Sequence, residues 1–224
     1  MELTMSISLL AYAFVLGLAH AFEADHLAAM TTFSKDFRNK KHSSKIGAYW
    51  GFGHTTTLFL VGGVLLLFKL SIPSVVEASF EAVVGVMLVL LGVQVFYKIR
   101  KDKLHVHQHE HDGVVHSHLH SHKGTATHTH GHRSFAVGVI HGLAGSGALL
   151  LLVLAASVSL ADGLVFILVF GLGSVVGMAF VGLCLGYMLE YAKHFTKVYT
   201  ALHYGAGVFS IYIGLSLVAG YLFP

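Results

Sequence analysis

Four ionisable side chains lie within seven residues of an otherwise apolar stretch. They are His20, Glu23, Asp25 and His26, in the order His-Ala-Phe-Glu-Ala-Asp-His. Such groups are costly at membrane depth, and they normally line a cavity or pair with one another. Two imidazoles with a carboxylate suit a borderline divalent cation such as Ni(II), Co(II) or Zn(II), whereas Mg(II) and Ca(II) prefer oxygen ligands alone. A proton relay or buried structural His–Asp pairs are the alternative interpretation.

Helix geometry sorts these four groups. At about 100° per residue, His20, Glu23 and His26 share one face of a straight helix, and Asp25 falls off that face. Either Asp25 contacts a neighbouring residue instead of the ion, or the helix is distorted and brings its carboxylate round.

Two further histidines are candidate ligands. His54 opens the run His-Thr-Thr-Thr inside a second apolar stretch, where the threonine hydroxyls can bond its ring or their own helix carbonyls. His141 precedes a glycine-rich run, residues 142–147, which either unwinds to offer backbone carbonyls or lets helices pack closely. For both histidines a structural role is the alternative.

Composition indicates a membrane protein. The chain of 224 residues is 55% apolar with a mean hydropathy of +0.73, and 11% of its residues are charged, less than half the usual share of about 25%. A single cysteine, Cys184, excludes an internal disulfide, and 14 Lys and Arg residues do not make a nucleic-acid binder. Collagen-like and disordered chains are excluded by the same composition.

Six apolar runs are long enough to cross a bilayer, which requires about 20 residues each. The first and fifth are longer than needed, so we expect tilt or a break in them. The runs are Thr4–Thr32, Ile46–Leu70, Glu77–Ile99, Ser134–Leu160, Gly163–Tyr191 and Val198–Phe223.

Basic residues predict the orientation. Thirteen of the 14 Lys and Arg residues lie in or beside the loops after the first, third and fifth runs, and Lys69 is the exception. Basic loops stay in the cytoplasm, so both termini are expected outside.

The two halves of the chain align with each other. Phe14, Gly17 and His20 match Phe135, Gly138 and His141 at an offset of 121. The glycines of the next two runs match at offsets of 120 and 122: Gly51, Gly53 and Gly62 with Gly171, Gly173 and Gly182, then Gly85 and Gly92 with Gly207 and Gly214. Since each half has three spans, the halves enter the membrane from opposite sides. This predicts an all-α membrane protein with a 3+3 inverted-topology repeat, whose halves rock about a shared substrate site near the midplane.

A histidine-rich segment separates the halves. We expect a first repeat over residues 1–100, a cytoplasmic loop over 101–133 and a second repeat over 134–224. Eleven of the 18 histidines lie in Leu104–His132. Such tracts usually bind metal, and this one is expected to have no fixed structure when empty and to buffer, capture or sense cytosolic metal. A dispensable insert is the alternative.

The motifs resemble those of the nickel/cobalt transporter family. His20-x4-Asp25-His26 is similar to its HX4DH signature, and Gly53-His54-Thr55 to its second signature. The six-run layout and the segment from His141 to Gly147 are closest to the short UreH-type urease-accessory members. The resemblance implies a permease with His20, Asp25 and His26 as essential ligands, joined by His54. Glu23 lies outside the shared signature, so its role depends on helix geometry alone.

The resulting prediction is a secondary transporter, not an enzyme, that takes up Ni(II), or Co(II), across a prokaryotic cytoplasmic membrane. The metal is a bound substrate, and no prosthetic group is expected. The predicted partners are the lipid bilayer and, by the resemblance, cytosolic nickel chaperones of urease or hydrogenase maturation, with no nucleic acid. A divalent-metal exporter whose loop collects Ni, Co or Zn is the main alternative. A rhomboid-like serine protease using Ser146 and His203 is a distant one.

Overall fold

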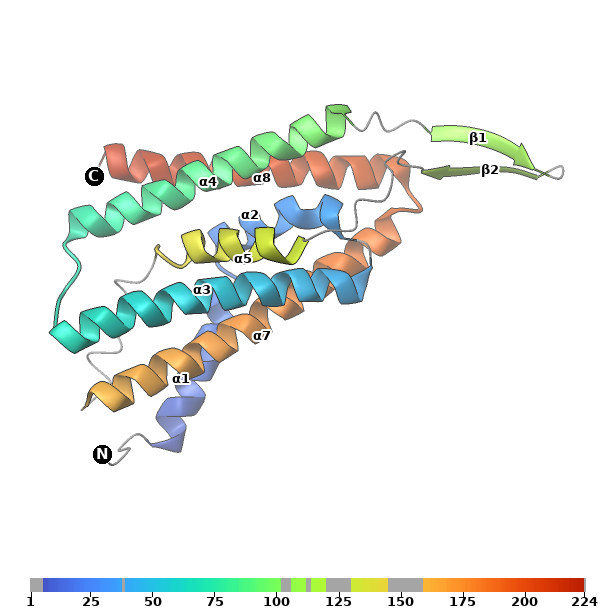
Figure 1. Ribbon diagram of the computed structural model, residues 1–224. Coiled ribbons are helices and arrows are strands. Elements are labelled where there is room, and N and C mark those ends of the chain that lie inside the picture. Colours follow the sequence, from blue (N-terminus) through green and yellow to red (C-terminus); the bar gives the residue numbers. More distant parts are fainter. Residues whose placement is uncertain are drawn as a thin grey trace.

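The structure is a computed structural model that describes residues 6–37, 39–101, 106–111, 114–119, 130–144 and 159–223. Outside one short hairpin, every described element is helical, which confirms the all-α expectation for the membrane part (Figure 1). The elements are α1 (Ile7–His20), α2 (Ala24–Thr32), the 3-10 helix η1 (Phe33–Asp36), α3 (Lys40–Phe68), α4 (Ser74–Lys101), β1 (Val106–His111), β2 (Val114–Leu119), α5 (His130–His141), α7 (Leu160–Ala192) and α8 (Thr196–Leu222).

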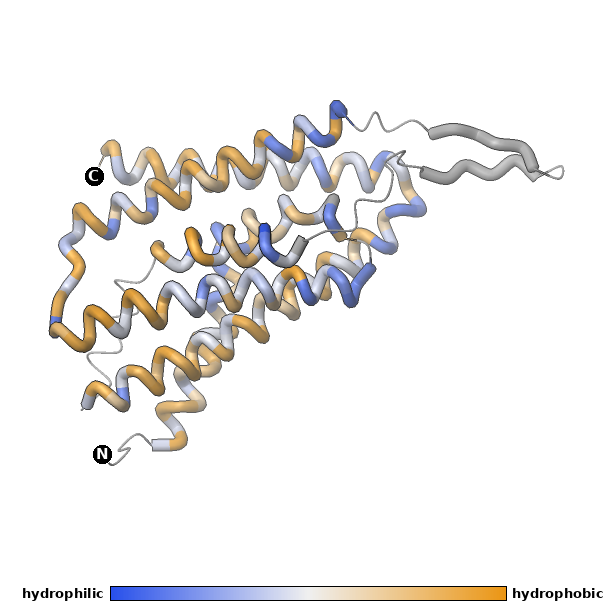
Figure 2. Tube along the Cα trace, viewed as in Figure 1, coloured by the Kyte–Doolittle hydropathy of each residue, from blue (hydrophilic) through white to orange (hydrophobic). Residues whose placement is uncertain are grey.

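Among the described residues, α3, α4, α7 and α8 are each long and apolar enough to cross a membrane. The pair α1 and α2 makes a fifth candidate, a span bent by 54° at a short break. Figure 2 shows apolar residues along most of each helix and hydrophilic residues gathered at the ends nearest the hairpin. The chain is therefore an integral, multi-pass membrane protein.

The expected fourth span, Ser134–Leu160, is described only at its two ends. α5 begins at His130, before the expected start, and runs to His141. Leu160 begins α7 instead of ending the fourth span. Residues 145–158 lie outside the described part of the chain, so the count of six spans stays a prediction.

The first apolar stretch is broken at its ionisable residues. α1 ends at His20, and Glu23 is the N-cap residue of α2. The amides of Phe22 and Glu23 close the intervening turn by donating to the carbonyls of Ala19 and His20. The excess length expected to produce tilt or a break therefore produces a sharp bend, and the bend places the start of α2 beside the end of α1.

Helices of the two sequence halves pack on each other at glycines. Gly53 on α3 lies against the carbonyl of Phe135 on α5, and Gly173 on α7 lies against the carbonyl of Phe14 on α1. A methyl group at either glycine would collide with that carbonyl oxygen. Small residues at such crossings let helix backbones approach closely in membranes.

The same reciprocity joins α4 to α8, which lie side by side in Figure 1. Gly85 meets the carbonyl of Gly214, and Gly92 meets the carbonyl of Gly207. The pairs run in opposite order along the two helices, so α4 and α8 are antiparallel.

The described helices form two packed groups. In the first, α3 packs on α5 and α7, and α7 packs on α1; in the second, α4 packs on α8. α2 lies mainly against α8 and α4, so the bend after α1 carries the chain from the first group to the second. A mostly apolar cavity of about 270 Å³ lies between the groups, lined by residues of α2, η1, α7 and α8.

Part of the histidine-rich segment forms an antiparallel pair of strands. β1 and β2 project away from the helices and pair with Val106 opposite Leu119 and His111 opposite Val114 (Figure 1). These strands differ from the expectation of a segment without fixed structure, which stays a prediction for the rest of the segment. The alternation of every second residue and the intervening Asp112-Gly113 sequence, typical of tight hairpins, favour strand pairing.

Candidate metal centre

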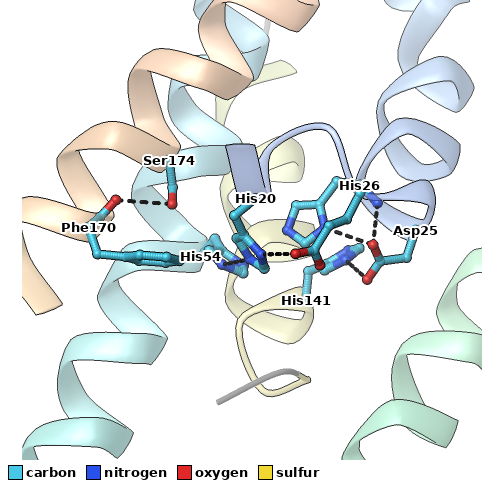
Figure 3. Close-up of polar contacts among 8 residues, drawn as sticks. His20, Asp25, His26, His54, His141, Phe170 and Ser174 are labelled. Carbon is cyan, nitrogen blue, oxygen red and sulfur yellow. Dashed lines mark hydrogen bonds and ion pairs between the residues drawn. The ribbon is translucent and has the colours of Figure 1, made fainter. Parts of the chain in front are cut away.

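Four imidazoles and one carboxylate converge where the first apolar stretch is broken (Figure 3). The structure thus brings together His20 at the end of α1, Asp25 and His26 in the first turn of α2, His54 within α3 and His141 at the end of α5. All five were predicted as ligands from the sequence, and they come from both halves of the chain.

The side chain of His20 contacts several other residues at the site. Its Nε2 lies 3.1 Å from Nε2 of His54, and its Nδ1 lies 2.9 Å from Oε1 of Glu23. The ring of His26 is edge-on to that of His20, with centroids 4.3 Å apart. Glu23 therefore reaches the cluster through His20, while 57% of its side chain stays exposed.

Asp25 bridges two histidines. Its Oδ1 accepts hydrogen bonds from the backbone amide and the Nδ1 of His26, at 2.8 and 2.9 Å. Its Oδ2 lies 3.0 Å from Nε2 of His141. Both alternatives left open by helix geometry therefore occur together, since the helix is broken and the carboxylate contacts neighbouring side chains.

The cluster is buried and keeps unused donor atoms. His26, His54 and His141 are at most 2% exposed. One ring nitrogen of each has no hydrogen-bond partner among the residues that the structure describes: Nε2 of His26, Nδ1 of His54 and Nδ1 of His141. Buried polar atoms are nearly always paired, so each unpaired nitrogen requires an explanation. At Nε2 of His26 a bound cation would supply one, because a neutral imidazole nitrogen is a common metal ligand.

Two overlapping sets of donors are close enough to hold an ion. One consists of His20, His26 and His54, and the other of Asp25, His26 and His141. Within each set the ligand atoms lie within 4.8 Å of one another. This donor chemistry matches the borderline cation expected from the sequence.

The threonines after His54 do not bond its ring. Thr55 donates to the carbonyl of Gly171 on α7, and Thr57 donates to the carbonyl of Val139 on α5. Thr56 bonds its own helix at Phe52. Two of the three hydroxyls therefore tie α3 to its neighbours and hold His54 in place indirectly.

Aromatic neighbours of the cluster escaped the sequence analysis. Trp50 is fully buried, and its ring centroid lies 5.4 Å from those of both His26 and His141. The ring centroid of Phe170 on α7 lies 5.4 Å from that of His20. Because Trp50 precedes His54 by four residues, about one helical turn, it shares a face with that histidine, and this spacing could have identified it.

A second polar cluster lies away from the metal centre. Asp36 at the end of η1 accepts from Lys98 on α4 and from Arg133 on α5, both at 3.1 Å. Arg133 also donates to Gln94 and lies over the ring of Phe33. Asp36 thus joins α4 to α5 through these two basic side chains.

By its architecture the chain is a polytopic membrane protein with a buried His/Asp cluster at a broken helix. Comparison with known proteins places it more narrowly. The family model for the transmembrane region of cytochrome c biogenesis proteins matches residues 12–216 of the chain. Urease accessory protein UreH from Bacillus sp. (strain TB-90) is 33% identical over 209 residues, which is 93% of this chain and 90% of UreH.

Two other relatives are more distant or shorter. A stretch of 50 residues, 22% of the chain, is 44% identical to the nickel transporter NixA of Staphylococcus aureus and covers 15% of that protein. Chloroplast protein FOR GROWTH AND FERTILITY 1 of Arabidopsis thaliana is 28% identical over 218 residues, and the match spans 60% of its length. No solved structure matches the chain.

The chain therefore belongs to this transmembrane family and, with UreH, to the UreH-type proteins. Its relatives of named function are a transporter and an accessory protein, so the chain is not an enzyme, as expected. Ser146, the nucleophile of the protease alternative, lies outside the described residues.

Proposed function

We propose that the chain is a secondary transporter that takes up Ni(II), with Co(II) as a second substrate, through the cluster of His20, Asp25, His26, His54 and His141. The observation that carries this proposal is the burial of four imidazoles and a carboxylate at a break in an apolar helix. Similarity to UreH and to NixA supports nickel as the substrate.

The cluster provides what a dehydrated cation needs at membrane depth. Imidazole nitrogens and the Asp25 carboxylate replace water ligands, and the carboxylate offsets part of the charge. Glu23 adds a second carboxylate at the exposed edge of the cluster, where it meets an arriving ion before His20 does. Ionisable groups at this depth are retained for such pathways, since their burial otherwise costs stability.

Reciprocal packing supports the inverted 3+3 repeat. Gly53 and Gly173 occupy matching positions, and so do the partners they meet, Phe135 and Phe14. A two-fold relation between the halves turns one of these contacts into the other. The start of α1 and the end of α8 both lie on the side of the helices away from the hairpin in Figure 1, as expected for an even number of spans.

The moving parts in this proposal are the two packed groups of helices, not the two sequence halves. The halves interleave through glycine contacts, so they do not form separate bodies. The cluster lies at the boundary between the groups, since His20, His54 and His141 belong to one and Asp25 and His26 to the other. The apolar cavity and the Asp36 ion pairs also lie at this boundary, and separation of the groups there would expose the cluster to one side.

Direction follows from the membrane potential in this account. With the basic loops in the cytoplasm of a prokaryotic cell, an inside-negative potential favours entry of a divalent ion by about 4.6 kcal/mol per 100 mV, twice the single-charge value. Uptake then needs no second ion. The histidine-rich loop would buffer the arriving ion and pass it to cytosolic nickel chaperones. An exporter would use the same ligands in the opposite direction.

The test is Ni(II) flux into proteoliposomes under an imposed inside-negative potential. The parent, His20→Ala and a variant lacking Leu104–His132 are compared, with Co(II) and Zn(II) as competing substrates. Flux that is lost in His20→Ala and kept in the loop deletion supports the proposal. Unchanged flux in His20→Ala would overturn the role of the cluster, and flux only out of the vesicles would favour export.

A further inference from the structure

We propose that the cluster holds the transported ion at two successive positions that share His26 as a ligand. This inference rests on the proposed transport function and deepens it. It begins from the two donor sets described above, which have His26 in common and differ in every other member.

The first position is formed by three imidazoles. Asp25 accepts the hydrogen bond of His26 Nδ1, which leaves the buried Nε2 of His26 as the nitrogen free for a metal. A carboxylate that holds one ring nitrogen in this way orients the other toward the ion. Nε2 of His20 and Nε2 of His54, 3.1 Å apart, complete the set. At this position Asp25 orients a ligand and is not itself one.

The second position uses Asp25 directly. The carboxylate lies between His26 Nδ1 and His141 Nε2, at 2.9 and 3.0 Å. A cation that bound here would displace these two protons, each of which moves to the other nitrogen of its own ring, Nε2 of His26 and Nδ1 of His141. The cation would then be bound by two neutral imidazoles and a carboxylate. His26 thus has one ring nitrogen for each position: the ion leaves Nε2 before it binds Nδ1, and the same ring serves as a ligand at both positions.

The two positions differ in exposure. His20 of the first set is 15% exposed in its side chain and contacts Glu23, which is open to the outside of the cluster. His141 of the second set is 1% exposed. His20 and His141 also occupy matching positions in the two halves, so each half contributes the corresponding histidine to one position. An ion entering past Glu23 reaches the imidazole position first.

One ion at a time is expected. Two divalent ions separated by a single imidazole ring would repel each other strongly in a buried site. A pathway must bind an ion firmly enough to admit it and loosely enough to release it, and two weak successive sets satisfy this better than one five-ligand cage. The proposal therefore predicts one bound ion with two alternative coordination shells.

The experiment compares Ni(II) bound to the purified full chain, at less than one equivalent, by X-ray absorption spectroscopy. His54→Ala removes a ligand of the first set, and His141→Ala removes a ligand of the second set. His26→Ala removes the shared ligand, so the nickel that still binds to this variant is nickel bound by the histidine-rich loop. His194→Ala is the control, because His194 is exposed and distant in sequence from the cluster. Glutamine variants at residues 54 and 141 replace any alanine variant that does not fold.

After subtraction of the His26→Ala spectrum, nickel in the His54 variant should show carboxylate oxygen, and nickel in the His141 variant should show imidazole nitrogen. Both variants should bind nickel yet transport it at least about 10-fold more slowly than the parent. Identical spectra in the two variants would overturn the proposal of two binding positions. Loss of nickel binding in both variants, as complete as in His26→Ala, would also overturn it. The proposed function fails separately, if the parent chain itself neither binds nor transports nickel.

Discussion

Matching positions in the two halves carry different chemistry on the same scaffold. His20 and His141 keep an imidazole in both halves, whereas His54 of α3 corresponds to Ser174 of α7 at the offset of 120. Ser174 is buried, and its hydroxyl donates to the carbonyl of Phe170 in its own helix, so it offers nothing to the cluster (Figure 3). Trp50 corresponds likewise to Phe170. The glycine contacts occur in both halves, while four of the five cluster residues lie in the first.

In this alignment the glycines that pack the helices match between the two halves, whereas most residues of the histidine cluster have no equivalent in the second half. Gly53 and Gly173 make equivalent contacts because each half must hold its partner helix at the same distance. A substrate site on the axis between the halves needs one set of ligands, so only one copy of each helix has to supply them. Substitutions at matching positions can therefore distinguish scaffold residues from ligands.

The largest expected effect comes from His26. His26→Ala removes a ligand common to both donor sets, so we expect nickel affinity and flux to fall by about 100-fold or more. Isothermal titration of the purified chain and vesicle flux measure the two effects. Full flux in this variant would show that the buried cluster has no part in transport. His194→Ala, an exposed histidine, should match the parent in both assays.

Glycine substitutions should affect the two halves alike. Gly53→Ala and Gly173→Ala each force a methyl group against a carbonyl oxygen of the facing helix, and each should cost about 1–3 kcal/mol of stability. Thermal unfolding in detergent measures the loss. Gly205→Ala is the matched control, because no atom lies within 4 Å of the added methyl group. A loss in one half only would contradict the equivalence of the two contacts.

The residues of the buried cluster were predictable from the sequence because ionisable groups in an apolar stretch are conspicuous. The spacing of His20, Asp25 and His26 marked them, but the position of the Asp25 carboxylate depends on the 54° bend, which no periodicity specifies. Trp50 was missed because a buried tryptophan in an apolar helix is usual. The glycine alignment predicted the repeat, whereas the interleaving of the halves follows from contacts distant in sequence.

A smaller effect on the opening of the structure is expected from the Asp36 ion pairs, at the boundary between the helix groups. Asp36→Asn removes the carboxylate that joins Lys98 to Arg133, and partly exposed ion pairs are worth about 1 kcal/mol, or about fivefold in an equilibrium. In a Cys184→Ala background, Ser34→Cys on η1 should react a few-fold faster with a maleimide once Asp36 is changed. Glu190→Gln, an exposed carboxylate changed in the same way, should leave the rate unaltered. An unchanged rate in Asp36→Asn would remove this cluster from the proposed opening.

The most direct test of the account compares His54→Ala with Ser174→Ala for Ni(II) flux into proteoliposomes. The two residues occupy matching positions, both are buried, and the account assigns metal binding to only one of them. We predict that His54→Ala loses at least about 90% of the flux, a 10-fold effect, while Ser174→Ala stays within about twofold of the parent. Equal losses in both variants, or full flux in His54→Ala, would contradict the central claim that the ion passes through the buried histidine cluster.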